Sequence, residues 1–186
     1  ASTFVSVLFS SMAAYSLVRL RYLYRDWLGR LILFTYLTPS ALLFIPLSVI
    51  IARLELGNTL HGLIFIYLTF AAPLSTWLLM GYFKGIPVEL EEQARVDGAT
   101  RLQAFVRILL PLTTPGLIAV SVFTFTAAWN EFLFALIFIT SPSLQTVPVA
   151  IGYLITGDVF RWGLIMAGAV SSAVPVMVLY YLAQRF

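Results

Sequence analysis

Hydrophobic residues run through this chain in long stretches, and short charged segments separate them. Five of the hydrophobic stretches are at least 18 residues long and contain no Asp, Glu, Lys or Arg. A helix rises 1.5 Å per residue, so about 20 apolar residues cross the hydrocarbon core of a bilayer. Because a backbone in lipid must satisfy its own hydrogen bonds, we expect each stretch to be helical. The expected spans are Ala1–Val18, Leu31–Ala52, Leu60–Phe83, Ile108–Asn130 and Trp162–Gln184.

Composition supports the same class. The 186 residues are 61% hydrophobic and 10% charged, with a mean hydropathy of +0.97. Soluble domains average about 25% charged residues. We therefore expect an all-α integral membrane protein, a polytopic helical bundle formed as a single domain over residues 1–186. The run Phe132–Thr140 is too short to cross and is expected to be an interfacial or re-entrant piece.

Basic residues are divided unequally between the two ends of the expected spans. Nine of the eleven fall on one side and two on the other. The side richer in Lys and Arg is normally cytoplasmic, so the chain is expected to start outside the cell and end inside it. Basic residues scattered over loops in this way do not indicate nucleic-acid binding. The nine are Arg19, Arg21, Arg25, Arg30, Lys84, Arg95, Arg101, Arg107 and Arg185, and the two are Arg53 and Arg161.

Both ends of the chain lie in or beside an expected span. We therefore expect at least one earlier span and a C-terminal tail outside this sequence. There is no cysteine and one histidine. A thiol nucleophile, a cysteine-ligated metal and a histidine-rich metal site are thereby excluded, and we expect no catalytic residue, metal site or cofactor site on this chain.

One long polar segment, residues 84–107, interrupts the hydrophobic pattern. Half of the eight acidic residues fall in it. Pro87 suits the start of a helix, and the acids that follow suit the positive end of its dipole. Asp97-Gly98 suits a left-handed C-cap, and Thr100 with Gln103 forms a capping-box pattern for a second helix. The segment therefore predicts a helix, a tight glycine turn, and a second helix that continues into the next span.

Two interpretations of this segment are open from its residues alone. Leu90 and Ala94 share one face of the first helix, and an apolar stripe flanked by carboxylates suits a groove on another protein. The alternative is a loop that rests on lipid headgroups. Such anchors are usually rich in Lys and Arg, and this segment begins with acids, which favours docking.

The same segment resembles the EAA loop of ABC importer permeases. The matching residues are Glu92-Gln93-Ala94, then Gly98, then Ile108-Leu109-Leu110-Pro111, with glutamine where the signature has alanine. Further segments resemble the permeases of maltose-type carbohydrate importers, and the resemblance covers nearly the whole chain. These segments are Ser10–Leu20, Pro87–Glu92 and Ala128–Phe132.

The resemblance implies a multi-pass permease in a prokaryotic cell membrane that carries a sugar, of di- or oligosaccharide size, into the cell. It implies three kinds of protein partner: a second homologous permease, a dimer of ATP-binding subunits and an external sugar-binding protein. ATP and Mg would bind the ATP-binding subunits, since this chain has no GxxxxGK[ST] sequence. The coupling residues would be Leu90, Glu92, Ala94, Asp97, Gly98 and Ala99, with Glu92 in a polar contact and Gly98 at the turn.

Trp129, Asn130 and Glu131 form a polar cluster near the outer end of the fourth expected span. One interpretation is an interfacial belt, where tryptophan is common. The other is a substrate pathway, in which an indole stacks on a sugar ring and the polar groups bond its hydroxyls.

Other transporter classes are weighed on the same pattern. An ion-coupled secondary transporter usually carries ionisable groups deep within its spans, and the expected spans here lack them. A structural membrane scaffold would not explain the helix-start and helix-capping residues within 84–107. An ABC permease for a solute other than sugar stays open.

Overall fold

In the computed structural model, which describes residues 1–156 and 159–185, the chain is largely helical. Its elements in chain order are α1 (Ser2–Arg19), α2 (Arg25–Tyr36), η1 (Ser40–Leu43), α3 (Phe44–Arg53), α4 (Leu60–Lys84), α5 (Glu89–Val96), α6 (Arg101–Ala104), η2 (Phe105–Leu109, a π-helix), α7 (Leu110–Leu112), α8 (Thr114–Trp129), α9 (Leu133–Phe138), η3 (Pro142–Leu144), α10 (Val147–Gly152), β1 (Ile155–Thr156), β2 (Val159–Phe160) and α11 (Trp162–Ala183).

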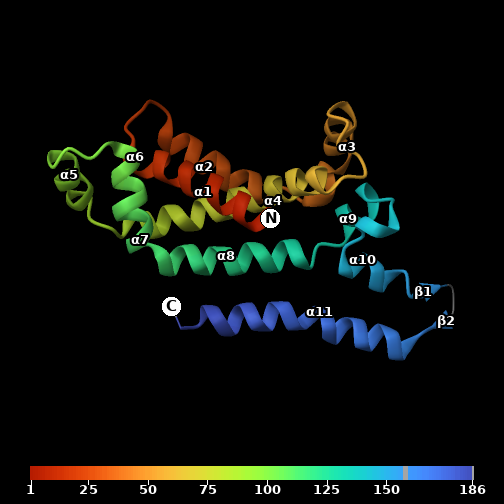
Figure 1. Cartoon of the computed structure of the whole chain (residues 1–186). Coiled ribbons are helices and arrows are strands. Elements are labelled where there is room, and N and C mark those ends of the chain that lie inside the picture. The colour runs from red at the N-terminus through yellow and green to blue at the C-terminus, as the bar shows by residue number, and fades with distance from the viewer. Residues whose placement is uncertain (157–158, 186) are drawn as a thin grey trace.

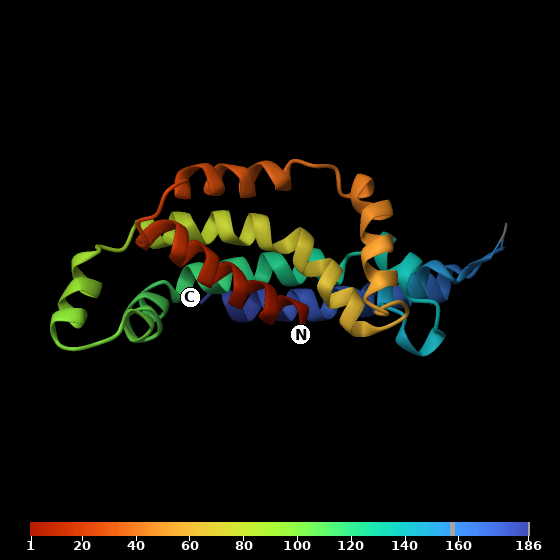
Figure 2. The ribbon, with the colours of Figure 1, turned by 90° about the horizontal axis from the view of Figure 1, so that it is seen from above.

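The long helices lie roughly side by side (Figures 1 and 2). In the view of Figure 1, α1, α2 and α4 form one layer, α8 lies below it, and α11 lies below α8. The elements α5, α6 and α7 gather at one end of the bundle. At the other end lie α3, α9, α10 and the hairpin of β1 and β2, which pairs Ile155 with Phe160. The expected short piece at Phe132–Thr140 is helical over α9.

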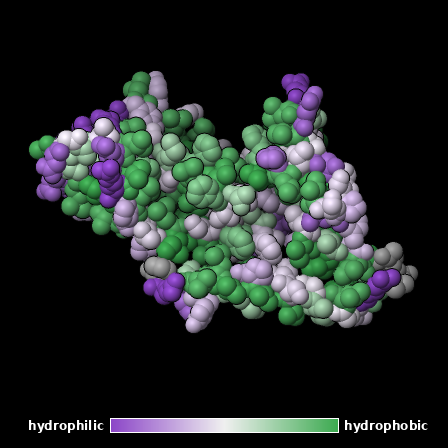
Figure 3. Space-filling view, in the orientation of Figure 1, coloured by the Kyte–Doolittle hydropathy of each residue, from purple (hydrophilic) through white to green (hydrophobic). Residues whose placement is uncertain are grey.

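The basic segments lie at the same end of the bundle, as the charge pattern predicts (Figure 1). The connection from α1 to α2, the segment between α4 and α8, and the C-terminal end of α11 all lie at the α5 end of the bundle. On the face shown in Figure 3, most hydrophilic side chains lie towards the ends of the molecule, and the surface between them is largely hydrophobic. This is the distribution that a bilayer requires.

The number of straight spans is smaller than the five expected windows. Among the described residues, two helices, α4 and α11, are long and apolar enough to cross a membrane alone, and up to four crossings result if each of two bent pairs counts as one. Helix α1 forms over the first window, but its 18 residues include five serines, which lower its hydropathy.

The window Leu31–Ala52 was expected to be one helix and is not. It is divided between α2 and the η1–α3 segment, and the two parts meet at 97°. Pro39 explains the break, because proline disfavours helical backbone at the residue before it and has no N–H to donate. Pro46 causes no such break because it lies in the first turn of α3, where N–H groups have no helical partner.

The fourth window is also bent, so the prediction that the second helix of residues 84–107 continues unbroken into the span is wrong. The segment Arg101–Leu112 meets α8 at 79°. Pro115 cannot donate a backbone hydrogen bond to the carbonyl of Pro111. The hydroxyl of Thr114 donates to that carbonyl instead, at 2.7 Å, and the hydroxyl of Thr113 donates to the carbonyl of Leu109 at 2.8 Å.

Buried side chains form two hydrophobic clusters, one towards each end of α4 and α8. The cluster farther from α5, which we call the outer cluster, joins α3, α4, α9 and α10. The cluster nearer α5, which we call the inner cluster, joins α1, α4, η2 and α8. Outer-cluster residues are Leu47, Ile51, Leu63, Ile66, Tyr67, Phe134, Ala135, Ile139 and Val149. Inner-cluster residues are Ala14, Leu79, Phe83, Phe105, Leu109 and Val120.

The contact between α1 and α4 is more extensive than the contact between any other two elements. Small polar residues of α1, among them Ser6, Ser10 and Ser11, are buried. Small side chains let helix backbones approach closely where burial from water supplies no driving force. The Ser10 hydroxyl also donates to the carbonyl of Ala72 in α4, at 3.3 Å.

Glycine at position 116 allows α8 to pack against α4. A methyl group there would lie 2.4 to 2.7 Å from ring atoms of Tyr82. Gly116→Ala should therefore lower the free energy of unfolding in detergent by about 1–3 kcal/mol, the usual cost of overpacking. Gly81→Ala is the control, because a methyl group at Gly81 meets nothing within 4 Å. Replacing Tyr82 with alanine in the Gly116→Ala background should restore stability, and equal stability of the two single variants would contradict this packing.

Candidate functional site

The segment between α4 and α8 forms an elbow of two short helices, α5 and α6, which we call the coupling elbow (residues 84–107). Gly98 has φ +92°, the left-handed conformation that ends α5. The amide of Ala99 donates to the carbonyl of Ala94 at 2.9 Å, and that of Gly98 to the carbonyl of Arg95 at 3.2 Å. These two bonds constitute a Schellman motif, so the predicted C-cap is confirmed.

The second arm starts with the predicted capping box. The Thr100 hydroxyl accepts from the amide of Gln103 at 3.3 Å, and the Gln103 side chain accepts from the amide of Thr100 at 2.8 Å. Only Ala99 separates this box from Gly98. The turn between the arms is therefore fixed by local bonds, and the elbow has a defined shape.

The predicted coupling residues lie together on this elbow, at the end of the bundle (Figures 1 and 2). Glu92, Asp97 and Gly98 are exposed, and Ala94 and Ala99 are partly exposed. Leu90 is 38% exposed and Val96 is 87% exposed. Apolar and acidic side chains thus share an uncovered surface, as a docking surface requires.

Glu91 differs from its acidic neighbours because it is buried. It is 4% exposed, and its Oε1 lies 2.5 Å from Nε of Arg19 at the end of α1. Sequence reasoning treated Glu91 as one of three first-turn acids and missed this pair. No local signal distinguishes it, since the two residues are 72 positions apart.

Trp129, at the outer end of α8, connects this helix to the last one. Its indole Nε1 donates to the carbonyl of Ser172 in α11 at 3.0 Å, and its ring stacks on Phe125 with centroids 5.4 Å apart. It also lines a cavity of about 340 Å³ with Tyr67, Gln145 and Thr146. Among the described residues, the Thr146 hydroxyl is buried without a hydrogen-bond partner.

Asn130 and Glu131 use their polar atoms on the protein itself. The Asn130 amide donates to the carbonyl of Thr126 at 2.9 Å, at the end of α8. The Glu131 carboxylate accepts from the amides of Phe134 and Ala135 at 2.9 and 3.0 Å, which caps α9, and from the Tyr67 hydroxyl at 3.2 Å. The three residues of the cluster are thus close in space, and two of them act as helix caps.

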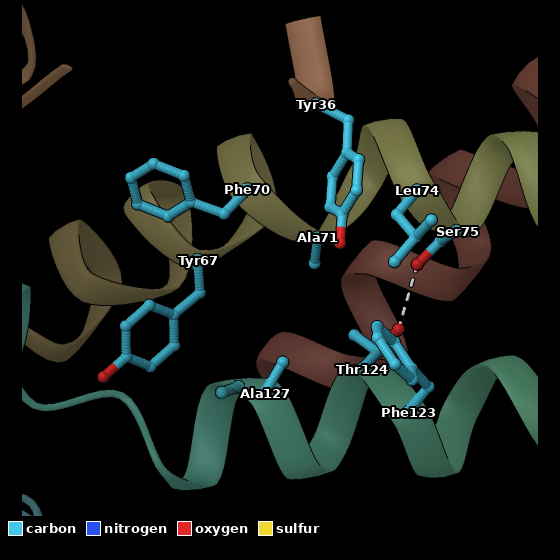
Figure 4. Close-up of a pocket in the computed structure, with 10 residues that line it drawn as sticks. Tyr36, Tyr67, Phe70, Ala71, Leu74, Ser75, Phe123, Thr124 and Ala127 are labelled. Atoms are coloured by element: carbon cyan, nitrogen blue, oxygen red, sulfur yellow. Dashed lines mark hydrogen bonds between the residues drawn. The ribbon is translucent and has the colours of Figure 1, made fainter. Parts of the chain in front are cut away.

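A second pocket lies between the two hydrophobic clusters, where α2, α4 and α8 face one another (Figure 4). Its volume is about 220 Å³. Tyr36, Phe70 and Phe123 surround it, and Ser75 and Thr124 share a hydrogen bond of 2.9 Å at one side. Sequence reasoning missed this pocket because its residues come from three helices, and each alone resembles an ordinary membrane-helix residue.

Within residues 1–156 and 159–185, no group of three or more His, Cys, Asp or Glu side chains is arranged to hold a metal ion.

Relatives of the chain include permeases from bacteria and archaea. It is 39% identical over 185 residues to the inner membrane ABC transporter permease protein YcjP of Escherichia coli (strain K12), matching 100% of this chain and 66% of that protein. It is 36% identical over 186 residues to the trehalose/maltose transport system permease protein MalG of Thermococcus litoralis, matching 99% of this chain and 66% of that protein. The chain thus spans about two thirds of the length of these relatives.

A solved structure shares the fold. The crystal structure of a bacterial ABC transporter involved in the import of the acidic polysaccharide alginate superposes with a TM-score of 0.70 at 22% identity, covering 100% of this chain and 74% of that one. The sequence pattern of one family, the binding-protein-dependent transport system inner membrane component, matches residues 6–186. The resemblance found in the coupling elbow is therefore confirmed across almost the whole length, and this chain belongs to that family of ABC transporter permeases.

Proposed function

We propose that this chain is the membrane permease of an ATP-driven importer, and that the coupling elbow is the part that a separate ATP-binding subunit grips. One observation carries this proposal: the elbow is fixed by caps at its turn and presents exposed acidic and apolar side chains beyond the bundle. A rigid element of this kind transmits force, whereas a flexible connector of the same length would absorb it. Family membership supports the same function.

The proposal assigns ATP chemistry to other chains. ATP and Mg bind a dimer of ATP-binding subunits, a second homologous permease completes the pathway, and an external binding protein delivers the substrate. This chain then acts without catalytic residues, in the cell membrane. Within the elbow, Glu92 makes a polar contact with the ATP-binding subunit, Leu90, Ala94 and Ala99 supply the apolar contact, and Asp97-Gly98 sets the turn.

A sugar is the proposed substrate. One relative is named as a trehalose/maltose permease. In this chain, Trp129 and Tyr67 line the outer cavity, and aromatic faces with nearby hydroxyl and amide groups suit the apolar faces and hydroxyls of a sugar ring. We assign the pathway role to the ring of Trp129, with Asn130 and Glu131 holding the backbone around it.

Changing the elbow should separate ATP hydrolysis from uptake. Glu92→Ala removes the proposed polar contact, and Gly98→Leu forces a branched residue into left-handed backbone, at a cost of about 1–2 kcal/mol. In proteoliposomes that contain the complete transporter, uptake of labelled sugar should fall roughly 5- to 150-fold, the usual range for a lost coupling energy. Membrane insertion should be unchanged.

Two further variants serve as controls for this test. Gly98→Asn should keep more uptake than Gly98→Leu, because asparagine tolerates left-handed backbone better. Asp26→Ala is the matched control, since Asp26 is an exposed acid at the same end of the bundle with only a 3.4 Å contact to Arg25. Normal uptake by both Glu92→Ala and Gly98→Leu would refute the coupling role.

Trp129 separates the two interpretations of the outer cluster. Trp129→Phe keeps a ring and loses the hydrogen bond to Ser172, whereas Trp129→Ala loses both. If the ring stacks on sugar, KM for uptake should rise up to about tenfold in Trp129→Ala, given about 0.5–1.5 kcal/mol for an aromatic contact, and much less in Trp129→Phe.

The measurement is uptake over a panel of labelled sugars and one amino acid, with thermal unfolding in detergent as the stability control. An unchanged KM in Trp129→Ala would leave Trp129 with a packing role only. Transport of the amino acid instead of any sugar would show a permease for another solute, and dependence on an ion gradient without ATP would show a secondary transporter.

A further inference from the structure

A buried ion pair connects the coupling elbow to the first helix of the bundle. Arg19 ends α1 and Glu91 lies in the first turn of α5, with Nε to Oε1 at 2.5 Å. Their side chains are 10% and 6% exposed. A second guanidinium nitrogen, Nη2, donates to the carbonyl of Ile86 at 2.7 Å. Arg19 therefore holds both α5 and the segment that leads into it.

Helix α1 also holds the other arm of the elbow. The Tyr15 ring packs against Phe105 in η2 with centroids 4.7 Å apart, and the Tyr15 hydroxyl donates to the carbonyl of Arg101 at 3.5 Å. Tyr15 lies one helical turn before Arg19. The last turns of α1 thus contact both arms, although α1 precedes the elbow by more than 60 residues in the chain.

The covalent connections of the elbow are bent at both ends. Helix α4 ends at Lys84, and the chain reaches α5 through non-helical residues around Pro87. On the other side the helix turns by 79° at Thr113 before α8 begins. A bend is a poor transmitter of rotation compared with a direct contact between rigid helices.

Burying this ion pair costs desolvation free energy, which an exposed contact to a surface loop would avoid. A carboxylate taken out of water is tolerated only with close partners, and the next residue, Glu92, is exposed. Glu91 is therefore the acid of α5 that contacts the bundle, and Glu92 is exposed for contact outside it. The charge-assisted geometry of an arginine that bonds two groups at once fixes orientation as well as position.

We propose that Arg19 and Glu91 are positioning residues that join the coupling elbow to α1, so that a displacement of α5 moves α1 with it as one body. This rests on the proposed function, in which an ATP-binding subunit displaces α5. Helix α1 is then displaced together with α5. The displacement reaches α4 through the contact between α1 and α4, the most extensive helix contact of the bundle.

The first test uses charge variants in the complete transporter in proteoliposomes. Arg19→Gln and Glu91→Gln should each lower sugar uptake roughly 5- to 150-fold, while ATP hydrolysis continues within about twofold of its normal rate. The exchange Arg19→Glu with Glu91→Arg should recover part of the lost uptake. Arg21→Gln, an exposed arginine two positions away, is the matched control and should transport normally.

Equal uptake by the single variants and the unaltered transporter would overturn the proposal. So would a fall of hydrolysis in step with uptake and no recovery on charge exchange, since that pattern indicates general damage.

The second test measures distances between labelled positions and needs no substrate. The chain has no cysteine, so spin labels can be placed at Phe4 in α1, Glu89 in α5 and Ala119 in α8, all of them exposed. On addition of ATP to the complete transporter, the distance from Glu89 to Ala119 should change and that from Glu89 to Phe4 should not. In Glu91→Gln, both distances should change.

A change between Glu89 and Phe4 as large as that between Glu89 and Ala119 in the unaltered pair, or no change in either, would overturn the proposal. These distances also separate its failure from that of the proposed function. If the unaltered transporter hydrolyses ATP and takes up no sugar, the substrate class is wrong, and the label distances still decide whether α1 and α5 move together.

Discussion

Backbone hydrogen bonding in an apolar surrounding decides where the helices of this chain are allowed to break. In lipid, each unpaired amide or carbonyl costs several kcal/mol, roughly the loss of a hydrogen bond without water to replace it. Side-chain oxygens bond backbone groups at several of these breaks. The Thr114 hydroxyl bonds the carbonyl of Pro111, which is freed at the 79° bend, and Glu131 caps α9. At the α3–α4 connection, Asn58 accepts from the amides of Thr140 and Ser141 at 3.0 and 2.9 Å, which ties two outer loops together.

The same constraint divides the bundle into regions of different firmness. Two dense clusters of apolar side chains lie towards the ends of α4 and α8. Between them lies the pocket of about 220 Å³ with the Ser75–Thr124 hydrogen bond at its side. Close-packed interiors transmit displacement as rigid bodies, and deformation concentrates where packing is open. A displacement that begins at the coupling elbow can therefore be taken up in the open middle of the bundle.

Local chemistry made part of this structure predictable. The cap at Gly98 and the box at Thr100 follow from residues within a few positions, so the elbow was expected from sequence and is present. The charge bias also placed the basic segments at one end. The bends did not follow from hydropathy, because Pro39 and Pro115 lie at breaks whereas Pro73 and Pro175 lie inside the continuous helices α4 and α11. The Arg19–Glu91 pair and the Trp129–Ser172 bond join positions 72 and 43 residues apart, and no single-chain pattern encodes such partners.

Helix α11 differs from the rest of the bundle in how little of it is covered. Within the described part of the chain, none of the side chains over its 22 residues is buried, and its main neighbours are α8 and α10. Most positions along it therefore make no buried contact within this chain, and a substitution that keeps them apolar costs this chain little folding energy. Exceptions are Gly168, where a methyl group would meet Ile151 at 3.0 Å, and the backbone of Ser172 that accepts from Trp129. The sequence of this helix can therefore change without disturbing the packing among α1, α4 and α8.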